Sequence, residues 1–158
     1  MRSVARTAYR YLGQMDKRSF KAMSRGLVIG LVIVIALAAD DITIPKKRSP
    51  GKNWNFALTH PTILLHIIFG TLVVLAAIVL LVRSIRSGDR ASIVVSLVGL
   101  AFVLLAWATG EQYVATLKNS ALSNMGIGWF GAIATYGAGW YLKRTRSTTM
   151  SSDPSAKA

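Results

Sequence analysis

The sequence contains no cysteine, and only six of its 158 residues are acidic. Without cysteine the chain cannot form disulfides, thiolate metal sites, cysteine-ligated iron–sulfur clusters or a covalent c-type haem attachment. Nineteen lysines and arginines give a net charge of +13, a balance typical of proteins that meet nucleic acid or an anionic membrane surface. The basic residues flank apolar blocks, and zinc-finger, homeodomain and RRM patterns are missing. We therefore expect a lipid bilayer, and not nucleic acid, as the partner.

Motifs of common enzymes are also missing. The chain has no G-x-S-x-G, no H-E-x-x-H and no phosphate-binding P-loop. The adjacent carboxylates Asp40 and Asp41 would point about 100° apart on a helix and would not share a substrate atom easily. We expect a protein without enzymatic activity.

What the chain has instead is apolar sequence in four blocks, with 53% hydrophobic residues and a mean hydropathy of +0.45. The blocks predict an all-α fold, a polytopic membrane four-helix bundle within residues 26–142. The predicted membrane spans are about 22–41, 57–82, 91–110 and 121–142. Loops are expected at 42–55, where Pro45, Pro50 and Gly51 oppose regular structure, and at 111–120, whose first half can extend the helix. Residues 143–158 predict a disordered cytoplasmic tail.

The N-terminal region leaves two questions open. Residues 1–25 carry a basic stripe that suits either an amphipathic helix on anionic lipids or a disordered basic segment. The first span is short, and Ala36-Leu37-Ala38 before Ala39 resembles a signal-peptide cleavage site, so cleavage would leave a three-helix bundle. We favour a retained helix. Either outcome places Asp40 outside the membrane.

The distribution of basic residues predicts the orientation. With the N-terminus inside, the inner segments carry fourteen lysines and arginines and the outer loops carry five. The positive-inside rule then places both termini of a multi-pass cell-membrane protein in the cytoplasm.

Small residues indicate how the helices pack, since membrane helices associate through close approach. In the fourth span Gly131, Thr135 and Gly139 recur every four residues, with Gly128 and Ala132 on a neighbouring line. Similar faces are formed by Ser92, Ser96 and Gly99 in the third span and by Gly26 and Gly30 in the first. The pattern favours a bundle, a homo-oligomer or a subunit of a membrane complex.

Polar and ionisable side chains concentrate at the outer end of the predicted bundle, and such groups in membranes are candidates for function. The outer polar cluster comprises Asp40, Asp41, Glu111, Tyr113 and Asn124. His60 begins the second span and His66 lies about 9 Å deeper. Six residues separate the two, about 240° around a helix, so we expect no shared metal ion.

His66 is the most informative residue, because an imidazole in hydrocarbon needs hydrogen-bond partners. It is either a ligand or relay group, or a residue that bonds a neighbouring helix. The segment HPTILLHIIFG resembles, over about half the chain, the small four-helix haem-binding membrane proteins of the cytochrome b561 and ferric-reductase type. This resemblance implies haem b, with His66, His60 and Met125 as candidate ligands. The family uses histidine pairs on different helices, whereas both histidines here share one.

The function expected from the sequence is that of a small non-enzymatic membrane subunit or module with a polar site near the outer leaflet. One alternative is a b-type haem electron-transfer protein. A second alternative is an oligomeric small-solute transporter or channel.

Overall fold

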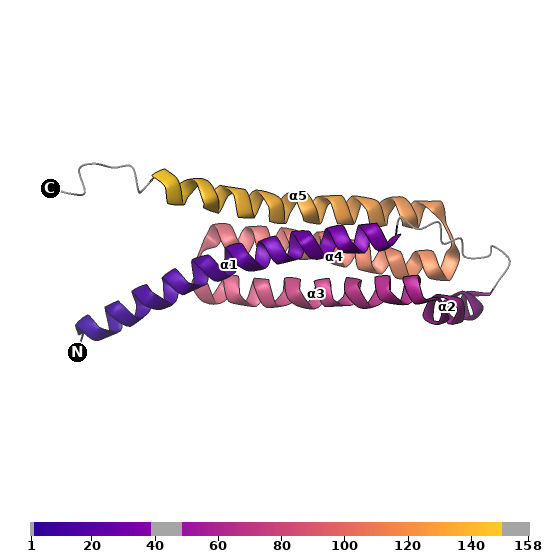
Figure 1. Cartoon of the computed structure of the whole chain (residues 1–158), viewed down its shortest axis with the longest axis horizontal. Helices are drawn as coiled ribbons and strands as arrows, with labels where there is room; N and C mark the ends of the chain where they lie inside the picture. The colour runs from indigo at the N-terminus through magenta and orange to yellow at the C-terminus, as the bar shows by residue number, and fades with distance from the viewer. Residues whose placement is uncertain (1, 39–48, 150–158) are drawn as a thin grey trace.

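The computed structural model describes the backbone of residues 2–38 and 49–149, and side chains from 19 to 38 and from 49 to 141. The described chain is helical throughout, with short connections. Its elements are α1 (Arg2–Ala38), α2 (Pro50–Thr59), α3 (Pro61–Ser87), α4 (Arg90–Thr116) and α5 (Asn119–Thr149). The four long helices run side by side, and both termini lie at the end of the bundle opposite α2 (Figure 1). We call these two ends the termini end and the α2 end.

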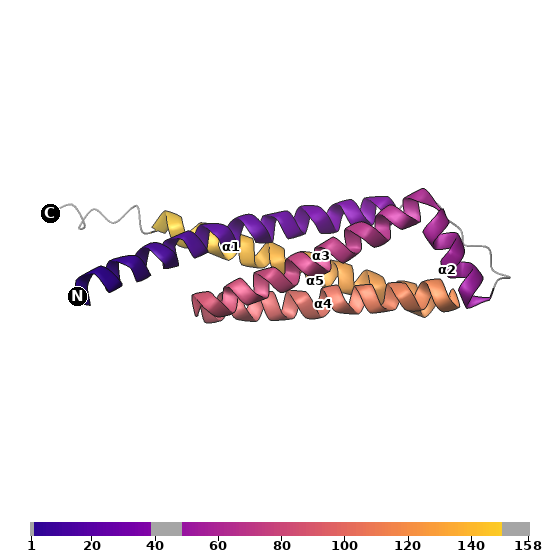
Figure 2. The same ribbon diagram turned by 90° about the horizontal axis from the view of Figure 1, so that it is seen from below.

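The long helices form a closed ring in which each contacts two others. The contacting pairs are α1 with α3, α3 with α4, α4 with α5, and α5 with α1. α3 runs diagonally, close to α1 at the α2 end and close to α4 at the other (Figure 2). A core of leucine, valine, alanine and aromatic side chains lies along the ring axis, including Leu31, Ala77, Val103 and Tyr136.

Three of the helical segments are long and apolar enough to cross a membrane, within the residues searched: Ser19–Ala38, Pro61–Ser87 and Arg90–Thr116. Large apolar side chains on their outer faces are exposed, among them Ile29, Leu72 and Val94. A soluble protein would not leave so much contiguous apolar surface in water. The all-α membrane bundle predicted from the sequence is therefore confirmed.

α5 is not among the three apolar spans. Its glycines, Asn124 and its serines lower its hydropathy. Of all the helix pairs in the described residues, α4 and α5 have the most extensive contact. The same small residues that make α5 less apolar allow this close approach. α5 contains the predicted fourth span, residues 121–142.

Two helix boundaries follow from local chemistry. Pro61 lacks an N–H and disfavours helical backbone at the preceding residue, so His60 adopts extended angles between α2 and α3. Gly88 ends α3 with a φ of 69°, a left-handed conformation that glycine adopts without steric cost. The connection between α3 and α4 is closed by the Ser92 hydroxyl, which donates to Asp89 Oδ2 over 2.6 Å.

Three predicted boundaries are wrong. Residues 50–55, predicted as loop, form part of α2, because Pro50 occupies the first helical turn, where proline is well tolerated. The second long helix begins at Pro61, next to His60 as the sequence indicates, so residues 57–59 of the predicted span belong to α2. Residues 143–149, predicted as disordered tail, continue α5.

Two other predictions concern helix extent, and some of the predicted residues are not described. Residues 2–25 are helical and continuous with the first span, as one of the two alternatives expected. The helix predicted to extend beyond residue 110 continues to Thr116. Asp40 and Asp41, and the tail from 150 to 158, lie outside the described residues.

Candidate functional site at the α2 end

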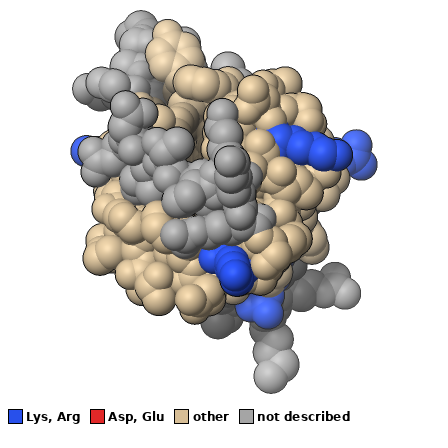
Figure 3. Space-filling view, turned by 90° about the vertical axis from the view of Figure 1, so that its right-hand side faces the viewer, with Lys and Arg blue, Asp and Glu red and all other residues tan. Residues whose placement is uncertain are grey.

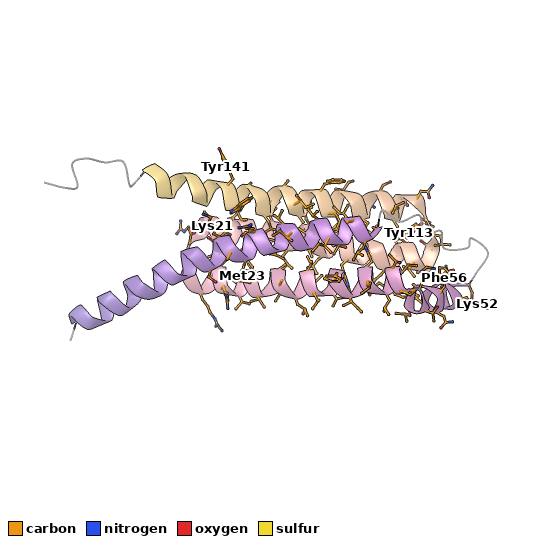
Figure 4. All side chains as sticks on the ribbon, in the orientation of Figure 1. Lys21, Met23, Lys52, Phe56, Tyr113 and Tyr141 are labelled. Atoms are coloured by element: carbon orange, nitrogen blue, oxygen red, sulfur yellow. The ribbon has the colours of Figure 1, made fainter. Side chains whose placement is uncertain are left out.

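α2 lies across the ends of α3 and α4 and is held there by a small apolar cluster. Ala57 of α2 and Val114 of α4 are its buried centre, and Trp54, Phe56 and Tyr113 pack around them. Figure 4 shows Phe56 and Tyr113 together at this end, while Lys52 extends from it. Because the cluster draws on three helices, α2 is fixed to the bundle, and its opposite face is presented outward.

The outward face of α2 is mixed in character. Lys52, Asn55 and Thr59 are exposed on it, and Leu58 among them is 51% exposed. Seen end-on, the described residues at this end carry basic side chains that lie apart from one another (Figure 3). This face is therefore polar apart from one apolar side chain, Leu58.

The predicted polar cluster is only partly assembled. Glu111 and Asn124 are exposed, and Tyr113 is half-buried beneath α2. Among the described residues no three histidine or acidic side chains come close enough to hold a metal ion. Glu111, Tyr113 and Asn124 thus differ in how far their side chains are exposed. Asp40 and Asp41 of the same cluster are not described.

His60 lies at the junction of α2 and α3. Its ring packs against Phe56, with centroids 5.1 Å apart, and its side chain forms no capping hydrogen bond. Its Nδ1 is buried without a hydrogen-bond partner among the described residues. Asn53, 2% exposed and on the inward side of α2, has an Oδ1 in the same condition. Of these two buried polar groups, His60 was a candidate from the sequence and Asn53 was not.

His66 contacts two other helices. Its Nδ1 lies 3.0 Å from the carbonyl oxygen of Val34 in α1, and its ring meets Trp129 of α5 edge to face at 6.4 Å. A carbonyl oxygen only accepts, so Nδ1 must carry the proton and Nε2 is left without it in the neutral ring. The hydrogen bond ties α3 to α1, and metal-bound histidines make the same kind of contact, so it is common to both alternatives.

Two of the candidate haem ligands, His66 and Met125, each contact a neighbouring helix. Metal-binding histidines commonly donate their second ring nitrogen to a carbonyl, so His66 satisfies the requirements of one ligand. The residue of α5 that faces its ring is Trp129. Met125 lies one turn from Trp129, and its sulfur packs towards Gly110 of α4. Haem binding stays a prediction of the family resemblance.

The His66 bond gives a testable prediction. We expect His66→Phe, which keeps the ring volume but loses the donor, to lower the free energy of unfolding by about 1 kcal/mol. His66→Gln retains a donor and should lose less. Reversible denaturation in mixed micelles measures both variants, and equal losses would contradict the hydrogen bond as the cause.

The fold and the apolar helices define the chain as a small helical membrane protein. Comparison with models of known protein families, with curated proteins and with solved structures found no match. The function therefore has to be argued from the chain's own residues.

Proposed function

We propose that this protein is a non-enzymatic membrane module, a small subunit that contacts a partner membrane protein through the α2 end of the bundle. The observation that supports it most is α2 itself. A short helix is fixed by Ala57 and Val114 across the bundle end and presents Leu58, Lys52 and Asn55 outward. A rigid surface with an apolar residue among polar ones suits recognition of another protein.

The chemistry of the polar residues supports the same proposal. Glu111 and Asn124 are exposed individually, and His66 is engaged with Val34. Catalysis needs reacting groups held within hydrogen-bond reach of one another. Exposed and separate polar groups instead suit the rim of a protein interface.

The proposed orientation places the α2 end outside and both termini in the cytoplasm. It rests on the excess of lysine and arginine in the segments at the termini end, which the positive-inside rule associates with the cytoplasmic side. In this orientation the basic N-terminal part of α1 would meet the anionic headgroups of the inner leaflet.

Site-specific photocrosslinking in native membranes tests the partner. A photoreactive residue at Leu58 is expected to give one discrete protein adduct. The control position is Ile85, which is similarly exposed, at 57%, but lies near the termini end. Combining Glu111→Gln with Asn124→Ala should weaken the Leu58 adduct about fivefold or more, since loss of several rim contacts costs about 1 kcal/mol or more. Absence of an adduct at Leu58, or equal adducts from both positions, would refute the proposed surface.

An absorption spectrum of the purified protein separates this proposal from the haem alternative. We expect no Soret band from cells replete with haem. A Soret band that disappears in His66→Ala would overturn the proposal in favour of electron transfer.

A further inference from the structure

Buried hydroxyl groups from all four long helices gather in the half of the bundle nearer the termini end. This set, which we call the hydroxyl group cluster, consists of Ser24 in α1, Ser84 in α3, Ser92 and Ser96 in α4, and Tyr136 in α5. Each of the five residues is exposed by 2% or less. Ser92 and Ser96, predicted from the sequence as part of a small-residue packing face, belong to this buried polar set.

Part of the cluster is satisfied by the protein. The Ser84 hydroxyl donates to the carbonyl oxygen of Leu80 over 2.8 Å, and its oxygen lies 2.8 Å from that of Ser96. A serine hydroxyl has one proton, so the proton between Ser84 and Ser96 belongs to Ser96. The oxygen of Ser96 consequently keeps its lone pairs free to accept a further hydrogen bond.

Two other members have no protein partner within the described residues, namely the hydroxyl groups of Ser24 and Tyr136. Both residues are 0% exposed, so bulk water does not reach them either. Burying a hydroxyl without a hydrogen bond costs about 1–3 kcal/mol, and native structures rarely tolerate it. Such a buried group is normally satisfied by an internal water.

The position of Tyr136 relates its hydroxyl to Ser96. The ring lies over Gly99 of α4, and a Cβ built there would stand 2.6 Å from Cε1 and 2.9 Å from Cε2. The carbon that bears the hydroxyl also faces Gly99. Gly99 follows Ser96 by three residues, a rise of about 4.5 Å on the same helix face. The spacing along α4 therefore places the ring of Tyr136 within about one helix turn of Ser96.

We propose that the hydroxyl group cluster is an internal water-binding site, in which a bound water accepts a hydrogen bond from Tyr136 and donates one to Ser96. The ligand is water because Tyr136 and Ser96 offer one donor and one acceptor. The carboxylate of Asp89, which contacts the cluster, already accepts a hydrogen bond from Ser92. Ser24 lies in α1 between the buried residues Phe20 and Leu27 in sequence, and its hydroxyl is a further buried group without a partner among the described residues. The site is separate from the α2 end and does not depend on the proposed partner.

The first test is the isosteric change Tyr136→Phe, which removes only the hydroxyl. If water satisfies Tyr136, the ratio of folded to unfolded protein should fall about two- to twelvefold, the range for one net hydrogen bond. A hydroxyl without any partner would give the opposite sign, because phenylalanine would relieve its desolvation cost. Tyr141→Phe, in the same helix but 63% exposed, is the matched control and should leave the ratio unchanged.

A double-mutant cycle and a direct observation complete the test. Ser96→Ala should cost less in the Tyr136→Phe background than in the wild type, since the bridging water is already lost. An experimental structure that resolves ordered water should show density within hydrogen-bond distance of both hydroxyl oxygens. A rise in stability for Tyr136→Phe, additive effects of the two changes, or no water density at that position would each overturn the proposal.

Discussion

Gly128→Ala is expected to destabilise the bundle by about 1–3 kcal/mol, the usual cost of forcing an extra methyl into a packed interface. A Cβ at Gly128 would stand 2.6 Å from the backbone nitrogen of Ala106 and 2.8 Å from the backbone oxygen of Phe102. Backbone atoms cannot rotate away as a side chain can, so α5 must move from α4. In a membrane, close approach of two helices also favours their association. Moving α5 away from α4 therefore weakens both the packing and the helix association.

Gly137→Ala is the matched control for Gly128→Ala. Both glycines lie in α5, but a Cβ at Gly137 would have no heavy atom within 4 Å. Alanine favours helix by up to about 1 kcal/mol relative to glycine, so this variant should be neutral or slightly more stable. Reversible unfolding in mixed micelles measures both variants. Equal losses would mean that the contact between α4 and α5 does not depend on the absence of a side chain at Gly128.

Gly99→Ala is the second change with a large expected effect, because Tyr136 occupies the space over Gly99. The ring is fully buried, and its atoms lie close to the position that a Cβ at Gly99 would take. We expect a loss of about 1–3 kcal/mol in the free energy of unfolding. In Gly99→Ala the added methyl meets a side chain, whereas in Gly128→Ala it meets the backbone.

A double-mutant cycle identifies the ring as the cause of the Gly99→Ala loss. Leucine at position 136 would end before the Cε and Cζ atoms that contact Gly99. Gly99→Ala should therefore cost little in the Tyr136→Leu background, with a coupling energy of about 0.5–3 kcal/mol. The same loss in both backgrounds would show that the ring of Tyr136 does not restrict Gly99.

The small-residue pattern of the sequence predicted part of this packing. Gly128, Gly131 and Gly139 all meet α4 closely, through Ala106, Phe102 and Val95 respectively. Gly30 meets Val73 of α3, whereas Gly26, predicted to act with it, has no neighbour within 4 Å of a built Cβ. Spacing along one helix identifies a smooth face, but which part of that face meets a neighbour depends on how the helices cross.

The helix α2 could not be predicted from the spacing or type of its residues. Proline and glycine oppose the interior of a helix, so Pro50 and Gly51 predict a loop. Proline is also common in the first turn of a helix, and with Ser49 as the N-cap the same residues predict a helix start. The arbitration comes from Ala57, whose burial against Val114 of α4 stabilises a helix of only 10 residues. Such a short helix depends on tertiary contacts that local sequence does not contain.

For the candidate residues too, the sequence indicates what a side chain requires but not which group supplies it. The need of His66 for a hydrogen-bond partner followed from its position in an apolar span, but its acceptor is the backbone carbonyl of Val34. A backbone group on another helix leaves no signal in the sequence. The sequence shows that Tyr136 has a hydroxyl, but the burial of this hydroxyl follows only from how the four long helices pack.

Cysteine accessibility in intact cells tests the central claim most directly, that the chain spans the membrane with the α2 end outside. Because the sequence has no native cysteine, single substitutions report one position each. Lys52→Cys, at the α2 end, should react with a membrane-impermeant maleimide added outside. Ser87→Cys, at the opposite end of α3, should react only after the cells are permeabilised. Labelling of Ser87→Cys from outside while Lys52→Cys stays protected would contradict the orientation, and outside labelling of both would contradict the membrane-spanning bundle.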